Sequence, residues 1–176
     1  MKRLIVLFVV MCCAVGTMQA QSQTQVQGYV FINSEAVFKS QTDYNDAIKQ
    51  LDDLAEQYQK EIDQAFADLD EQYNNYIAQR GYLSETSKKM REDEIINRER
   101  ELKQYQEQIF GPEGDLMKKR VELIKPIQER VFGVINSYAE SHGLGMIIDR
   151  ANNQTLLYYA PALDKTEEII NLLNTK

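Results

Sequence analysis

Apolar side chains recur along the middle of the chain in the alternating three- and four-residue steps of a coiled-coil seam. They fall at Tyr44, Ile48, Leu51, Ala55, Tyr58, Ile62, Ala65 and Leu69. Tyr73 and Tyr76 continue the pattern after one extra four-residue step, a stutter that locally relaxes a supercoil. No glycine or proline interrupts residues 43–80, so the pattern predicts a single helix about 55 Å long.

A second long helix is predicted to return alongside the first. Gly81 breaks the outgoing helix, and Ser84 followed by Glu85 is a typical helix start. Ile95, Leu102 and Ile109 then recur at seven-residue spacing. Because so few residues join the two helices, we expect an antiparallel hairpin with its tip at about residues 80–88.

The segment Phe110-Gly111-Pro112-Glu113-Gly114 interrupts the return helix. Pro112 lacks a backbone donor, and Gly111 and Gly114 loosen the chain on either side of it. Residues 111–114 are therefore predicted to be a hinge in the arm. A further helix with one apolar face, containing Pro126, is expected from about Leu116 to Ser141.

Short β-branched and aromatic runs near both ends of the chain predict three buried strands. They are Tyr29–Ile32, Met146–Ile148 and Leu156–Tyr159, and a last helix follows from Asp164 through Leu173. The fold class is therefore α+β and mainly α. Residues 44–125 form the helical arm, and residues 29–43 and 126–176 form a small body. A sheet of three short strands leaves edges open, so we expect an oligomer that closes them.

The first twenty residues have the order of a secretory signal peptide. Lys2 and Arg3 precede the apolar run from Leu4 to Val15, and small residues allow cleavage after Ala20. A retained membrane anchor is the alternative, but twelve apolar residues are short for a membrane span. Cleavage removes both cysteines of the chain, which suits an exported protein. Residues 21–28 are predicted to be a flexible, polar lead-in.

Charge and composition exclude several classes of function. The chain carries a formal charge of −7, and loss of Lys2 and Arg3 leaves 18 basic against 27 acidic residues, which argues against nucleic-acid binding. A single histidine, His142, stands where a helix should end and needs no catalytic role. The mature chain has no cysteine and no phosphate-binding loop. We therefore expect no enzyme, metal, cofactor or small-molecule substrate.

Aromatic residues on the predicted arm are the candidate binding residues. Tyr58 and Tyr73 are expected to fill the seam between the helices, because they follow its spacing. A hairpin of two helices cannot bury a wide apolar stripe, and tyrosine suits weak, varied contacts. The predicted binding residues are Phe66, Tyr76, Tyr82 and Tyr105.

Charge is also segregated along the arm. Residues 43–79 hold ten acidic residues and two lysines. A basic cluster is predicted at the tip, made of Arg80, Lys88, Lys89 and Arg91. Ordinary solubility explains this pattern; the functional alternative is an acidic arm whose basic tip first meets acidic partners.

Two segments resemble the Skp/OmpH family of periplasmic chaperones. Tyr29-Val30-Phe31-Ile32-Asn33-Ser34-Glu35-Ala36-Val37-Phe38 is similar to the opening strand and turn of that family. Ile135 to Asp149, with the sequence Ile-Asn-Ser-Tyr-Ala-Glu-Ser-His-Gly-Leu-Gly-Met-Ile-Ile-Asp, looks like its closing helix and strand. The resemblance extends over the whole mature chain, through the Tyr158-Tyr159 strand and the helix start at Asp164.

The resemblance implies a periplasmic homotrimer with a central β-body and three hairpins around a cavity. It also implies binding of unfolded outer-membrane proteins without ATP, which makes the protein a holdase. The expected oligomer contacts include Tyr29, Phe31, Ile148 and Leu157. Well-known members are basic, whereas this chain is acidic, which argues against capture of lipid headgroups at the arm tips.

A second hypothesis is a structural spacer or adaptor of the cell envelope that binds one folded partner. A spacer should have a continuous seam and one specific sticky end. The predicted stutter, the Gly-Pro break and the surplus of aromatic residues favour the chaperone instead.

Overall fold

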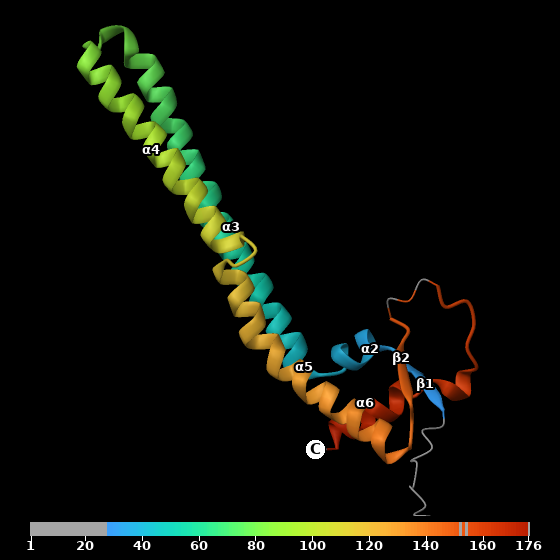
Figure 1. The fold of residues 1–176 in the computed structure, drawn as a ribbon. Helices are drawn as coiled ribbons and strands as arrows, with labels where there is room; N and C mark the ends of the chain where they lie inside the picture. Colours follow the sequence, from blue (N-terminus) through green and yellow to red (C-terminus); the bar gives the residue numbers. More distant parts are fainter. Residues whose placement is uncertain (1–27, 152, 154, 176) are drawn as a thin grey trace, which may run out of the picture.

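The computed structural model describes residues 28–151, 153 and 155–175 as a long helical arm attached to a small body (Figure 1). The predicted signal peptide and most of the predicted lead-in lie outside the described residues. No helix within the described ranges is both long enough and apolar enough to cross a membrane.

The arm is an antiparallel hairpin. Helix α3 (Thr42–Gln79) leads out to a short 3-10 turn, η2 (Arg80–Tyr82), and helix α4 (Glu85–Phe110) returns beside it. The Ser84 hydroxyl accepts a hydrogen bond from the Ser87 backbone N–H at 3.2 Å and so caps α4, as expected. The seam buries Leu51, Ile62, Leu69 and Tyr76 from α3 with Leu102 and Ile109 from α4.

The return path is broken where the glycines and proline predict it. Helix α4 ends at Phe110, and helix α5 (Asp115–Ser141) begins after Gly114 and continues along α3 toward the body (Figure 1). A Cβ atom at Gly111 would lie 2.4 Å from the Glu107 carbonyl oxygen, and one at Gly114 would lie 2.5 Å from that of Ile109. The tight backbone packing therefore requires glycine at both positions.

The body joins the two ends of the chain. Strand β1 (Tyr29–Ile32) pairs in parallel with β2 (Met146–Asp149), with Phe31 opposite Ile148. Asn33 caps helix α2 (Ser34–Lys39), and helix α6 (Thr166–Asn174) follows the 3-10 turn η3 (Pro161–Leu163). The strand pair is what anchors the ends of a hairpin that otherwise extends away from the body.

Helices α2, α5 and α6 meet the first strand in a compact apolar core. The fully enclosed side chains are those of Val37, Val131 and Ile169, one from each helix. Helix α5 ends in a Schellman motif at Gly143, whose φ of 60° places it in the left-handed region. The Leu144 N–H there donates to the Ala139 carbonyl at 2.9 Å, and the chain turns directly into β2.

The prediction of a third strand at Leu156–Tyr159 is wrong for the isolated chain. These residues have no regular secondary structure, and Leu157 is 95% exposed. Their apolar and aromatic character resembles a strand, but among the described residues they pair with neither β1 nor β2. The sheet of the single chain is therefore the two-stranded pair β1–β2.

Candidate functional site

The seam of the arm keeps its heptad register as far as the tip. From Leu69 it passes through the half-buried Gln72 to Tyr76, which is only 3% exposed. Tyr73 lies outside the seam and is 50% exposed. The predictions for the two tyrosines were therefore the wrong way round. The predicted stutter is also absent, because the three-residue step after Leu69 leads to Gln72 and the regular heptad spacing continues to Tyr76.

Tyr76 closes the outer part of the hairpin through a polar contact. Its hydroxyl donates a hydrogen bond to the Glu92 carboxylate on α4, and Arg80 lies 3.9 Å from the same carboxylate. The hydrogen bond to Glu92, followed by burial, raises the pKa of Tyr76 above its usual value. This buried residue links the two helices and is not available to a ligand, contrary to the prediction for it.

The other predicted binding residues are accessible to different degrees. Phe66 is half-buried beside the seam, and Tyr82 at the tip is 93% exposed. Tyr105 is half-buried, and its hydroxyl lies 3.4 Å from a Glu61 carboxylate oxygen across the hairpin. Tyr82 is therefore the most accessible of the three, and Tyr105 is tied to the arm's own structure.

The predicted basic cluster lies at the end of the arm, but most of it is engaged there. The contacts are Arg80 with Glu92 at 3.9 Å, Lys88 with Glu85 at 2.6 Å, and Arg91 with the Gln79 side chain at 2.8 Å. Residues 80–94 carry four basic and four acidic side chains. The count balances because Glu92, Asp93 and Glu94 follow the cluster on α4; residues 80–91 alone carry four basic side chains and one acidic side chain, Glu85.

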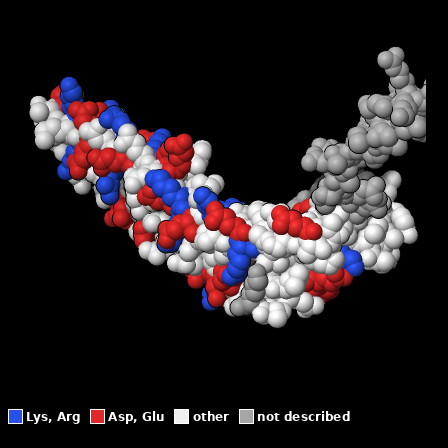
Figure 2. All heavy atoms as spheres, turned by 60° about the horizontal axis from the view of Figure 1, so that its bottom comes forward, with Lys and Arg blue, Asp and Glu red and all other residues white. Residues whose placement is uncertain are grey.

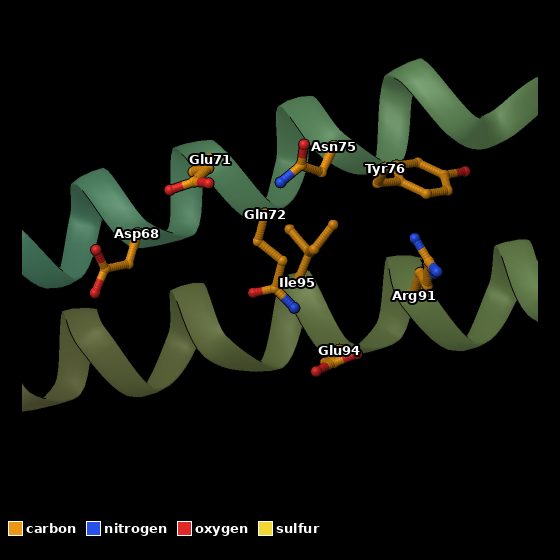
Figure 3. Close-up of a pocket in the computed structure, with 8 residues that line it drawn as sticks. All are labelled: Asp68, Glu71, Gln72, Asn75, Tyr76, Arg91, Glu94 and Ile95. Atoms are coloured by element: carbon orange, nitrogen blue, oxygen red, sulfur yellow. The ribbon is translucent and has the colours of Figure 1, made fainter.

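A polar groove of about 430 Å³ runs along one side of the outer arm (Figure 3). Its lining is Asp68, Glu71, Gln72, Asn75, Tyr76, Arg91, Glu94 and Ile95. A neighbouring groove contains Asp93, Glu94 and Glu101 from α4. One side of the hairpin is therefore dominated by carboxylates and amides drawn from both helices.

The predicted oligomerisation residues divide into exposed and internal ones. Tyr29 is 51% exposed, Leu157 is almost fully exposed, and Ile148 is half-buried. Phe31 is buried within the protomer, and its ring lies 5.1 Å from the Tyr159 ring. A charge at Phe31 would therefore disrupt the protomer itself rather than only a contact between protomers.

The surface of the body beside β2 is apolar and grooved. A groove of about 470 Å³ is bordered by Phe38, Phe132, Leu144, Met146 and Ile147, among others. On the side shown in Figure 2, charged atoms cover the arm densely, whereas the body is largely uncharged. The arm and the body therefore present surfaces of different character.

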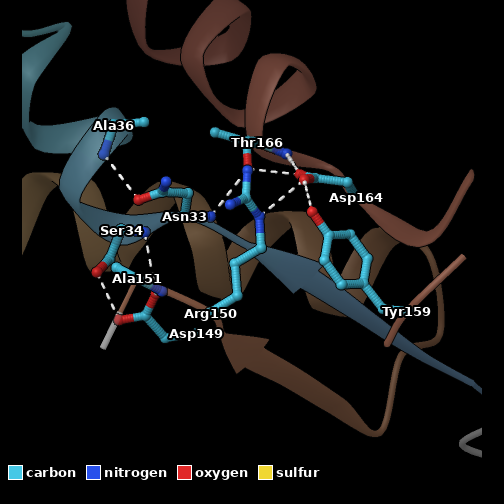
Figure 4. A network of polar contacts seen from close by, with 9 residues as sticks. All are labelled: Asn33, Ser34, Ala36, Asp149, Arg150, Ala151, Tyr159, Asp164 and Thr166. Atoms are coloured by element: carbon cyan, nitrogen blue, oxygen red, sulfur yellow. Dashed lines mark hydrogen bonds and ion pairs between the residues drawn. The ribbon is translucent and has the colours of Figure 1, made fainter. Parts of the chain in front are cut away.

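The body is closed by a polar network centred on Asp164 (Figure 4). Its carboxylate accepts hydrogen bonds from Arg150 Nε at 2.9 Å and from the Thr166 backbone N–H at 3.0 Å. The Tyr159 hydroxyl lies 3.3 Å from the same carboxylate. Burial alone would raise the pKa of Asp164, but the hydrogen bonds of Thr166 and the Arg150 guanidinium hold it below its usual value.

Comparison with known proteins identifies the family. The profile of the family "Outer membrane protein (OmpH-like)" matches residues 28–173. This chain belongs to the OmpH-like family. The crystal structure of a protein from Caulobacter crescentus named as an OmpH-like outer membrane chaperone has the same fold, with a TM-score of 0.66 at 11% identity. The alignment covers 84% of each chain. No curated protein matches the sequence.

Membership of the OmpH-like family confirms the resemblance noted in the sequence and the prediction that the chain is not an enzyme. The fold agrees as well, since long helices and a small strand pair make up most of the OmpH-like chain. Sequence reasoning did not find the Asp164 network. Asp164 was noticed only as a helix start, and nothing in the pattern linked it to Arg150 or Tyr159.

Proposed function

We propose that this OmpH-like protein is a nucleotide-independent holdase that keeps unfolded outer-membrane proteins, its clients, from aggregating in the periplasm. The observation that carries the proposal is the arm, which exposes apolar side chains that its own fold does not need. Tyr73, Ile77, Tyr82 and Ile96 are each about half or more exposed on a helical hairpin. Tyr73 and Ile77 are about one helical turn apart on α3, and adjoining exposed apolar side chains are typical of an interaction surface.

Weak contacts distributed over several arms suit this task. Each exposed residue offers a small, reversible contact, and several arms acting together give avidity without a single tight site. The acidic arm keeps a complex soluble through charge repulsion. Because Arg80, Lys88 and Arg91 are engaged by side chains of the arm itself, we do not assign the tip a role in binding lipid headgroups.

A homotrimer is the assembly that we propose. Among the described residues, β2 pairs only with β1, so its second edge is open to another chain. Leu157 and Tyr158 protrude close to the strand pair and are 95% and 81% exposed. The groove beside Met146 supplies an apolar surface to bury. Pairing of residues 156–159 with a neighbouring protomer would restore the strand that the single chain lacks.

The alternative, a structural spacer, is strengthened by one finding and weakened by two. The continuous heptad seam removes the stutter from the argument against a spacer. The break at Gly111–Gly114 and the exposed apolar residues remain, and a rigid spacer needs neither. These two features favour the holdase.

The two functions are distinguished by the state of the partner. The mature protein, residues 21–176, is mixed with one outer-membrane β-barrel protein, either denatured or folded in detergent, and the mixtures are separated by size-exclusion chromatography without nucleotide. A holdase binds the denatured form only. Binding of the folded form alone, or of neither form, would reject the proposal.

A shortened arm supplies the matched control. Glu61 and Tyr105 lie opposite each other, so residues 62–104 can be replaced by a short glycine-rich turn that joins them. The body and the inner arm should stay folded, because their core does not include the removed residues. We expect this variant to retain much less denatured client than the full-length arm does.

A further inference from the structure

The arm has an apolar side opposite the acidic groove. Each residue of an α-helix is turned by about 100° from the one before, so residues two positions apart point to nearly opposite sides. Tyr73 and Ile77 each stand two positions from the groove residue Asn75, and Ile96 stands two positions from Glu94. All three are about half exposed. Since Asn75 and Glu94 face one groove, these apolar residues share the other side of the hairpin.

This apolar side continues toward the body into a groove at the helix break. Ile48 and Ala55 line the groove from the seam, and Asp52 lines it at the heptad position that Phe66 and Tyr73 occupy further along α3. Phe110 lies at the end of α4, on the other wall. The groove therefore opens on the same side of the hairpin as Phe66, Tyr73 and Ile77.

The groove at the break has room for one aromatic ring. Its volume is about 270 Å³, and an enclosed cavity of about 150 Å³ is enough to bind benzene. Its lining is Ile48, Leu51, Asp52, Ala55, Phe110, Gly111, Leu116, Met117 and Arg120. Most of these side chains are apolar, and the two charged ones come from facing helices.

The sequence creates this space in two ways. Ala55 places only a methyl group at a seam position where neighbouring heptads carry larger residues such as Ile48 and Ile62. The break then separates Phe110 from Leu116, and the backbone approaches at Gly111 and Gly114 leave no room for a side chain there. The gap is therefore a built feature of the arm.

We propose that this groove binds an aromatic side chain of an extended client segment, so that the break is a binding pocket as well as a predicted hinge. The inference rests on the proposed holdase function and names the side chain that one site recognises. Met117 offers its thioether, Arg120 its guanidinium and Phe110 its ring, and each of these groups favours an aromatic partner. Phe110 and Met117 are 37% and 44% exposed and thus accessible from solvent.

Charge indicates what surrounds that side chain in the client. Asp52 and Arg120, of opposite charge, both line the groove, and residues 48–56 and 107–120 around it hold six acidic against four basic residues. A segment with lysine or arginine beside its aromatic residue is therefore favoured over an acidic one.

Filling the groove tests the proposal. The probe is a fluorescent 13-residue peptide with one central phenylalanine flanked by lysines, compared with the same peptide carrying alanine at the centre. Ala55→Leu should weaken binding of the phenylalanine peptide about tenfold or more, the effect expected when one aromatic side chain loses its burial. Ala67→Leu, an equal change at an exposed position of α3, should leave binding unchanged. The proposal would be refuted if Ala55→Leu and the unchanged protein bound the phenylalanine peptide with equal affinity.

Three methionines report where the peptide binds. Met117 lines the groove at the break, Met90 lines a groove on the acidic side, and Met146 borders the groove of the body. With ¹³C-methyl methionine, the phenylalanine peptide should shift the Met117 resonance and leave the other two in place. A shift of Met90 or Met146 instead, or of none, contradicts the proposal. A Met117 resonance that moves with protein concentration in the absence of peptide also contradicts the proposal, because a second arm would then fill the groove.

The outcome is independent of the broader function. The groove is not a client pocket if the unchanged protein and Ala55→Leu retain denatured β-barrel protein equally and the peptide does not shift the Met117 resonance. The holdase function stands in that case. If neither retains client, the proposed function itself fails.

Discussion

Replacement of Asp164 should loosen the body of the protein while leaving the outer arm intact. The carboxylate receives hydrogen bonds from three residues, namely Arg150, Tyr159 and Thr166, and Thr166 donates through both its backbone N–H and its hydroxyl. Lys165, next in the chain, donates its backbone N–H to the Phe31 carbonyl at 2.8 Å. The Asp164 carboxylate therefore ties the start of helix α6 to Arg150, just after β2, and to the Tyr159 loop, next to the backbone bond that joins Lys165 to β1.

The expected loss follows from these contacts. A hydrogen bond to a charged group contributes about 1.5 to 3 kcal/mol when its partners are buried. The Asp164 side chain is still 21% exposed, so water can replace part of what is lost. We expect Asp164→Ala to lower the free energy of unfolding by about 2 to 3 kcal/mol, or the melting temperature by about 5 to 10 °C. Asp164→Asn keeps one acceptor oxygen and should lose roughly half as much.

Thermal unfolding followed by circular dichroism measures the loss, at one protein concentration because assembly contributes to apparent stability. Hydrogen exchange should show faster exchange in β1, β2 and α6 and unchanged exchange in the outer parts of α3 and α4. Asp70→Ala, at an exposed carboxylate on α3, is the control and should change little. A loss below about 0.5 kcal/mol for Asp164→Ala, or equal loosening of the arm, would refute the reasoning.

Three further outcomes are expected. The double substitution Leu157→Asp and Tyr158→Asp should convert the proposed trimer into folded monomers, because charge is costly in a buried contact. A trimer that persists in light scattering would contradict this proposed assembly. Hydrogen exchange across residues 108–118 should be faster than in the flanking helices, and equal protection would remove the hinge. Acid should destabilise the body. Hydrogen bonds hold the pKa values of Asp149 and Asp164 below normal despite burial. The contribution of these two carboxylates to the free energy of unfolding is therefore present above about pH 4, and it is lost as the pH falls through their folded-state pKa values. A pH profile unchanged in Asp164→Asn would contradict that assignment.

The hairpin could be predicted from the sequence because its signals are local. Heptad spacing, an uninterrupted run of helix-forming residues and the Gly81–Ser84 turn each act within a few residues of the chain. The assignment of Tyr73 to the seam and of Tyr76 to the surface was wrong because the side-chain type at residues 72 and 73 disagrees with the heptad register. An aromatic residue one position off the seam looks more apolar than Gln72, but the geometry of the helix keeps the glutamine at the seam.

The body was less predictable because its order depends on contacts distant in sequence. Leu156–Tyr159 has the composition of a strand, yet a segment becomes a strand only when it pairs with an edge, and among the described residues it pairs with neither β1 nor the open edge of β2. The Asp164 network joins residues from three separate segments, at Arg150, at Tyr159 and at Asp164–Thr166, which no local pattern reveals. The groove at the break escaped notice for the same reason, since it needs Ala55 to face Phe110 and Met117 across the arm.

Light scattering of a denatured outer-membrane β-barrel protein, diluted from denaturant into buffer with and without the mature protein, tests the central claim most directly. No nucleotide is present, and an equal mass of an unrelated soluble protein is the control. The account predicts that scattering is suppressed in proportion to the protein added, up to a fixed ratio of protomers to client. Scattering that rises as fast as in the control would contradict it.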